Sequence, residues 1–105
     1  MTEELQPDDR VLVLHDGQLS SLRLREWSQA LPQGVLVGIG DSGLMRNARR
    51  ELADCENALF APGSRTEIPW RDSFFTVVFD TVDGPATPEM LRVLHPAGRI
   101  YSIQP

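Results

Sequence analysis

The 105-residue sequence contains no lysine, one cysteine and two histidines. Without lysine, the chain cannot form a Schiff base through an ε-amine. Because Cys55 is alone, it forms no internal disulfide and no thiolate cage around a metal. His15 and His95 lie near opposite ends of the chain, so no local metal motif exists. We therefore expect no metal, and the single cysteine fits a reducing, cytoplasmic compartment.

The sequence also lacks a long apolar run and an excess of basic residues. No segment approaches the ~20 apolar residues that a membrane helix needs. The net charge is −5, whereas a protein that binds nucleic-acid phosphates needs a basic patch. We therefore expect neither a membrane nor a nucleic acid as partner. Residues 1–10 are polar and acidic, which predicts a flexible lead-in to one domain of residues 11–105.

Short apolar runs alternate with stretches of helical spacing along the rest of the chain. Strands are predicted at 11–14, 35–39, 58–61, 74–79 and 99–103. Helices are predicted where a capping residue precedes such a stretch, at Ser20 or Ser21, at Asp41 or Ser42, and at Thr87. The segment 96–98, Pro-Ala-Gly, is expected to end the last helix. This alternation predicts an α/β fold with a parallel sheet and helices on both faces.

Several short sequence motifs, taken together with their order and spacing, resemble those of the class I S-adenosylmethionine-dependent methyltransferases. They are Val37-Gly38-Ile39 followed by Ser42 and Met45, then residues 67–70, 72–74, 77–79 and 89–99. The resemblance covers roughly residues 11–105. It implies a Rossmann-like sheet of about five strands in the order 3-2-1-4-5. The family continues with two more strands, which this chain lacks.

The positions that the resemblance assigns to the cofactor depart from the family pattern. The family has an acid in strand one and a Gly-x-Gly-x-Gly loop, which match Val13 and then His15, Gly17 and Leu19. Side chains at the first and last of these loop positions would occupy space that the ligand needs. The cofactor loop implied by the resemblance is therefore reduced to one glycine.

The acids that contact the nucleoside in the family are also displaced. The acid that binds the ribose falls on Gly40, with Asp41 one residue later, and the acid near the adenine falls on Ser64. Losing two charged hydrogen bonds at ~1.5–3 kcal/mol each lowers affinity by about two to four orders of magnitude. The resemblance thus implies that S-adenosylmethionine binding is weak or lost. The candidate contacts that remain are Asp16, Gly17, Gly40, Asp41, Ser64 and Arg65.

The segment from Gly38 to Gly43 also fits the Gly-x-Gly-x-x-Gly pattern of dinucleotide-binding turns. It follows a strand and precedes a helix, and backbone amides at a helix start can hold a diphosphate. However, the motif follows the second strand and no acid stands about 20 residues further on. Arg65 could instead meet a 2′-phosphate. A tight turn with a helix cap is the favoured interpretation.

Three residues are candidates for catalysis. His15 follows the first strand and could act as a general base, and Asp80 and Asp83 follow the fourth strand, where the family faces its methyl acceptor. The ordinary interpretations are a loop histidine and a solvated turn, and we favour them. Trp70 is expected to pack in the core, or to line an adenine pocket if one is present.

These observations leave more than one function open. The leading hypothesis is a degenerate methyltransferase-like domain that is not catalytic alone and serves as an interaction or regulatory module. Strand five would be an edge, so a homodimer or a partner protein is expected to cover it. The alternatives are an active or partner-completed S-adenosylmethionine-dependent methyltransferase, and a nucleotide-binding oxidoreductase fragment.

Overall fold

A single parallel sheet forms the centre of the computed structural model, which describes residues 5–17, 19–81 and 84–103. The strand order is β3-β2-β1-β4-β5, as predicted. The strands are β1 (Arg10–Leu14), β2 (Val35–Gly40), β3 (Ala58–Pro62), β4 (Phe75–Asp80) and β5 (Leu94–Ser102). Each predicted strand is present, and all bounds agree within a residue or two except that β5 begins five residues earlier than expected; the α/β fold class is confirmed.

The inner strands are apolar because both of their faces are covered. Val11, Leu12 and Val13 in β1 are fully buried, as are Val77 and Val78 in β4. Alternate residues of each strand contribute to two separate hydrophobic cores, one on each face of the sheet. The apolar run in β4 predicted a sheet that is covered on both faces. The structure confirms this, because β4 contributes residues to both cores.

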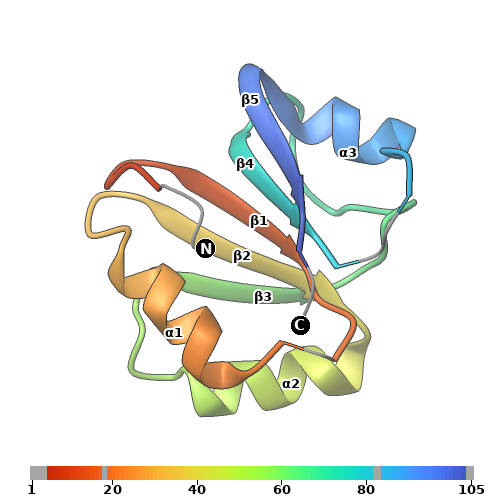
Figure 1. The fold of residues 1–105 in the computed structure, drawn as a ribbon. Helices are drawn as coiled ribbons and strands as arrows, with labels where there is room; N and C mark the ends of the chain where they lie inside the picture. Colours follow the sequence, from red (N-terminus) through yellow and green to blue (C-terminus); the bar gives the residue numbers. More distant parts are fainter. Residues whose placement is uncertain (1–4, 18, 82–83, 104–105) are drawn as a thin grey trace.

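Three helices connect the strands and cover both faces (Figure 1). They are α1 (Ser21–Gln29), α2 (Ser42–Glu51) and α3 (Pro88–Val93). Their N-caps are Ser20, Asp41 and Thr87, each accepting a bond from a backbone amide of the first turn. Helices α1 and α2 pack on one core, and α3 packs on the other. The capping residues thus begin the helices where the sequence indicated.

The end of α3 differs from the prediction. The helix ends at Val93, and Leu94 is already extended, with φ −82° and ψ 130°. The segment 96–98 therefore does not close the helix but lies in the irregular first half of β5, where the pairing with β4 shifts register between Phe75 and Val77. A proline favours extended backbone for the residue before it, which here is His95. The prediction of a helix up to residue 96 did not take this into account.

The described part of the predicted lead-in packs against the sheet. Leu5 contacts the core on the α1 and α2 side. Asp9 is buried, and its carboxylate accepts bonds from the Gln6 amide and the Thr76 hydroxyl, each at 2.8 Å. Residues 5–10 therefore belong to the packed domain. No helix among the described residues is long and apolar enough to cross a membrane.

Candidate functional site

A hollow of about 410 Å³ opens at the carboxyl ends of the inner strands. In parallel α/β sheets, ligands bind at this edge, where the connections from neighbouring strands diverge to opposite faces. The hollow lies within the size range of small-molecule sites. Its lining residues come from the ends of four strands and the loops after them: Leu14, His15, Asp16, Ile39, Gly40, Asp41, Gly63, Ser64, Arg65, Thr66 and Thr81. Most of the site residues predicted from the sequence therefore meet here.

His15 forms one wall of this hollow directly after β1. Its backbone amide donates to the carbonyl of Ile39 at 2.9 Å, which ties it to the end of β2. Its side chain is buried, and Nδ1 accepts a bond from the Gly17 amide at 3.3 Å. Burial lowers the pKa of His15 below its ordinary value of 6.5, and the charge of Asp16 opposes this only in part. The imidazole is therefore neutral at pH 7.

Gly40 lies where a side chain has no room. A Cβ atom at this position would be 2.4 Å from the carbonyl oxygen of His15 and 3.1 Å from the Cε atom of Met45. The first neighbour is backbone, which cannot rotate away. An acid at position 40 would therefore require the ends of β1 and β2 to move apart.

Asp41 reaches the same rim but is engaged by the helix behind it. One carboxylate oxygen accepts from the amides of Gly43 and Leu44, at 3.1 and 3.4 Å. This is an N-cap interaction, which satisfies amides that have no partner within the helix. The acid that follows Gly40 is thus used to begin α2.

Arg65 and Asp80 form an ion pair beside the hollow. The guanidinium donates from Nε and Nη2 to the carboxylate, at 2.8 to 3.2 Å, and Asp80 is only 2% exposed. The hydrogen bond to Asp80 raises the pKa of Arg65 above its ordinary value. Arg65 also donates to the carbonyl of Pro85 at 3.1 Å, and its own carbonyl accepts from the Thr87 hydroxyl at 2.5 Å. Arg65 therefore links the β3–β4 loop to the β4–α3 loop.

Comparisons with known proteins agree with this geometry at the level of the fold. No protein-family model matches the chain, and no curated protein matches it either. Solved structures do match. The YcgJ protein from Bacillus subtilis aligns with a TM-score of 0.76 and 20% identity, over 96% of this chain and 46% of that one. The chain has a class I methyltransferase-like fold.

Two further structures with this methyltransferase-like fold show how much of it the chain spans. One is a complex between the Haloferax volcanii Trm112 methyltransferase activator and a candidate methyltransferase, with a TM-score of 0.74, 24% identity, and coverage of 93% of this chain and 45% of that one. The other is geranyl diphosphate methyltransferase in complex with SAM, with a TM-score of 0.67, 13% identity, and coverage of 93% and 42%. The chain thus spans less than half the length of these structures.

Within the methyltransferase-like fold, the predicted loop residues separate into two environments. Asp16 lines the hollow, Gly17 and Leu19 lie in a smaller depression beside α1 and α2, and His15 lies between the two and lines both. Leu19 is 7% exposed and packs in the core. Gly17 has φ +98°, which a residue with a side chain rarely adopts. The Leu19 side chain therefore packs in the core and does not line the hollow of about 410 Å³.

The glycines in and just after β2 have local structural roles. A Cβ atom at Gly38 would lie 2.5 Å from the ring of Phe60 on β3. Gly43 lies in the first turn of α2, where Asp41 bonds its amide. Gly40, as described above, lies against the carbonyl of His15. Gly38 and Gly40 are thus required by close packing, and Gly43 lies in the capped first turn of α2; this supports the tight turn and helix cap and gives no support to the oxidoreductase hypothesis.

The remaining candidates take varied positions. Ser64 lines the hollow, but its hydroxyl lies 3.2 Å from that of Thr66 and accepts the Thr66 amide, so it shapes a turn. Thr81 was missed, although its position after a buried strand is a usable signal; it donates to the Leu14 carbonyl at 2.8 Å. Asp83 lies outside the described residues. Trp70 packs near Phe74 and Phe75 and does not line the hollow described above.

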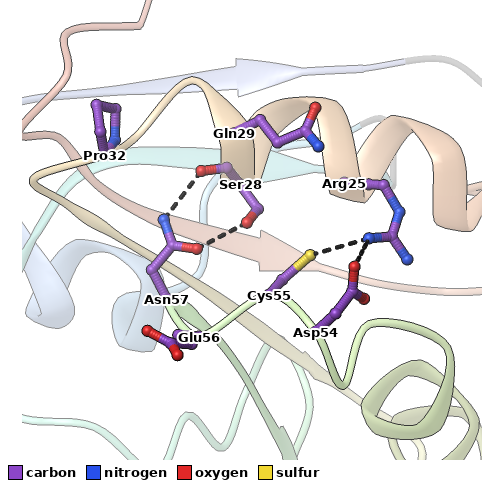
Figure 2. Close-up of a pocket in the computed structure, with 8 residues that line it drawn as sticks. All are labelled: Arg25, Ser28, Gln29, Pro32, Asp54, Cys55, Glu56 and Asn57. Atoms are coloured by element: carbon purple, nitrogen blue, oxygen red, sulfur yellow. Dashed lines mark hydrogen bonds and ion pairs between the residues drawn. The ribbon is translucent and has the colours of Figure 1, made fainter.

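A second hollow, of about 370 Å³, lies at the opposite end of the sheet between α1 and the α2–β3 loop. Figure 2 shows its polar side chains bonded to one another. Asn57 exchanges bonds with Ser28 at 2.7 and 2.9 Å, and Arg25 contacts Asp54 at 2.5 Å and the Cys55 sulfur at 3.4 Å. These bonds fasten the loop to α1, so we interpret this hollow as structural. No group of potential metal ligands is present in the described ranges.

Proposed function

We propose that this chain is a methyltransferase-like module that does not methylate by itself and acts by contacting another protein chain. The observation that carries the proposal is the absence of space at Gly40. The ribose acid implied by the resemblance would stand there, yet a Cβ atom would approach the His15 carbonyl oxygen to 2.4 Å. The site therefore lacks the acid that would bind the ribose, and it also lacks the space that a side chain at position 40 would need.

The charges around the hollow support the same conclusion. S-adenosylmethionine carries a sulfonium and an ammonium group, which a carboxylate in the site would attract. Asp80 is placed to do so by sequence, but its carboxylate is bonded by Arg65. Asp41 holds the start of α2. A ligand would have to displace these internal partners, and that lowers its net binding energy.

Calorimetric titration of the chain with S-adenosylmethionine and S-adenosylhomocysteine tests the proposal. We expect no saturable heat and therefore a Kd weaker than about 1 mM, which corresponds to a binding free energy smaller than about 4 kcal/mol. Geranyl diphosphate methyltransferase, whose structure contains SAM, provides the positive control. A Kd in the micromolar range would contradict the proposal.

A partner-completed methyltransferase is the second candidate. A hollow large enough for a small molecule remains at the expected edge of the sheet. In addition, one of the similar structures is a complex with a methyltransferase activator, and the chain spans less than half of that structure's methyltransferase. Native isolation of the chain from its source cells, followed by mass spectrometry of bound small molecules, distinguishes the candidates. Co-purified S-adenosylmethionine or S-adenosylhomocysteine would favour this second candidate.

The contact with another chain is proposed to use β5. This strand lies at one end of the sheet order, and edge strands can pair with a further strand. We propose a homodimer or a partner protein at this edge, within a cytoplasmic compartment that keeps Cys55 reduced.

A further inference from the structure

The two edge strands differ in how their outward backbone groups are satisfied. In β3, the Gly63 amide bonds to the Gly40 carbonyl of β2 at 3.0 Å. Because the bonding direction alternates along a strand, the backbone groups of Phe60 face away from β2. The Phe60 carbonyl accepts a bond from Arg49 Nε at 3.0 Å. A charged side chain therefore lies across this edge, a common protection against pairing with another chain.

Among the described residues, no charged side chain bonds the outward backbone groups of β5. The Ile103 amide donates to the Asp80 carbonyl of β4 at 2.9 Å. By the same alternation, the amide of Tyr101 faces β4, whereas the backbone groups of Ile100 and Ser102 face outward. No hydrogen bond within the described part of the chain engages those outward groups. This short segment is therefore an open template for pairing.

We propose that the strand paired with β5 is β5 of a second copy of this chain, running antiparallel, with Tyr101 opposite Tyr101 of the partner subunit. This inference deepens the partner role proposed above and rests on it. In this register, Ile100 lies opposite Ser102 of the partner subunit. Both residues present an outward N–H and an outward C=O, so each pair exchanges two hydrogen bonds of the antiparallel ladder. The edge is thus complementary to itself about a two-fold axis.

The side chains and charges of the strand fit this arrangement. Arg99 lies over the ring of Tyr101, with Cζ 5.6 Å from the ring centroid. In the proposed register Arg99 lies opposite Ile103 of the partner subunit, so the two arginines do not face each other, and like charges opposite one another would destabilise the pair. The tyrosines meet at the centre, where aromatic pairs across strands are favourable.

The extent of the seam is limited by the irregular first half of β5. Pro96 has no N–H to donate, and the register shift with β4 precedes Arg99. Pairing is therefore confined to about five residues around Tyr101. An interface of this length buries little surface, so we expect a weak dimer whose population rises with concentration.

Light scattering after size exclusion, over a range of loading concentrations, tests the dimer. The wild-type mass should rise from 11.7 kDa towards twice that value. Ser102→Pro removes an outward N–H and should remain a monomer, whereas Ser102→Ala keeps the amide and should dimerise like the wild type. Circular dichroism checks that each variant is folded. A wild type that stays monomeric at its solubility limit, or a Ser102→Pro variant that dimerises equally, would overturn the proposal.

Cysteine cross-linking in a Cys55→Ser background tests the register. Opposite residues of a non-hydrogen-bonded antiparallel pair have Cα atoms about 4.5 Å apart, within disulfide range. Tyr101→Cys should therefore form a disulfide-linked dimer under mild oxidation, and Ser102→Cys should not. If Tyr101→Cys is unstable, an equimolar mixture of Ile100→Cys and Ser102→Cys should cross-link instead. Cross-linking by Ser102→Cys alone would refute the register. Since no ligand is involved, these results are independent of the S-adenosylmethionine titration.

Discussion

Replacing Gly40 by alanine tests the steric argument on which the proposed function depends. The added methyl carbon would lie 2.4 Å from the His15 carbonyl oxygen, and real Cβ contacts are essentially never under 3.0 Å. Either the end of β2 or the end of β1 must therefore shift. The hydrogen bond from the His15 amide to the Ile39 carbonyl, at 2.9 Å, joins these two strand ends, so that shift would break it.

The expected loss of stability has two contributions. Breaking one backbone hydrogen bond costs about 1 kcal/mol. Forcing an extra carbon into a packed site costs a further ~1–3 kcal/mol. Gly40→Ala should therefore lower the free energy of unfolding by about 2–4 kcal/mol, a large part of what a domain of this size possesses.

Urea denaturation followed by the fluorescence of Trp27 and Trp70 measures this change. Gly43→Ala is the matched control, because its Cβ atom would meet only the flexible Asp41 carboxylate, at 3.3 Å. Alanine is also the better helix former, so the control should equal the parent or exceed it by up to about 1 kcal/mol. The m-value should stay constant in both variants, since neither changes the surface exposed on unfolding.

A Gly40→Ala variant within about 0.5 kcal/mol of the parent would refute the reasoning, because single surface changes are of that size. It would mean that the strand ends separate at little cost. A side chain could then stand at position 40, and the steric case against a ribose contact there would fail.

Further variants test the other parts of the site. Asp41→Ala should lower the free energy of unfolding by about 0.5–2 kcal/mol through loss of the N-cap, with Asp41→Asn close to the parent in urea denaturation; equal losses would show that the cap is unimportant. Arg65→Ala should cost about 2–3 kcal/mol, below the usual range for a fully buried pair because Arg65 is 26% exposed while Asp80 is 2% exposed; a neutral result in the same assay would contradict a structural role. The bond from Arg92 lowers the pKa of Glu89 from 4.5 to about 2. A lowered pKa contributes stability above pH 4.5 that is lost as the pH falls towards 2, so acid unfolding curves of Glu89→Gln should be flatter in that window, and parallel curves would contradict the assignment.

Much of the fold was predictable because local signals agree with the tertiary structure. The apolar run ending in Asp80 has no polar face, so it predicted a central strand before its neighbours were known. Ser20, Asp41 and Thr87 each combine a short polar side chain with a helical pattern, and each begins a helix. These signals depend on residues close in sequence, and close neighbours are what a sequence pattern describes well.

The parts of the site that were not predictable depend on distant residues. Arg65 and Asp80 were proposed for separate roles, as a phosphate contact and a catalytic acid, yet they bond each other, because the β3–β4 loop returns to the end of β4. The tight fit of Gly40 depends on a carbonyl of the neighbouring strand. Leu19, two residues after the positive-φ Gly17, packs in the core. Each outcome depends on how a loop or a neighbouring strand runs in three dimensions. The spacing of residues along the sequence does not predict that path.

The bond between Arg49 and the Phe60 carbonyl has a consequence for how the protein behaves when concentrated. A sheet with two bare margins can add chains at both, and such growth is open-ended, as in amyloid fibrils. Here one margin is occupied by a guanidinium from the same molecule. In the dimer proposed above, association through β5 would therefore end after a single pairing event, because the other edge of the sheet is not free to add a further chain.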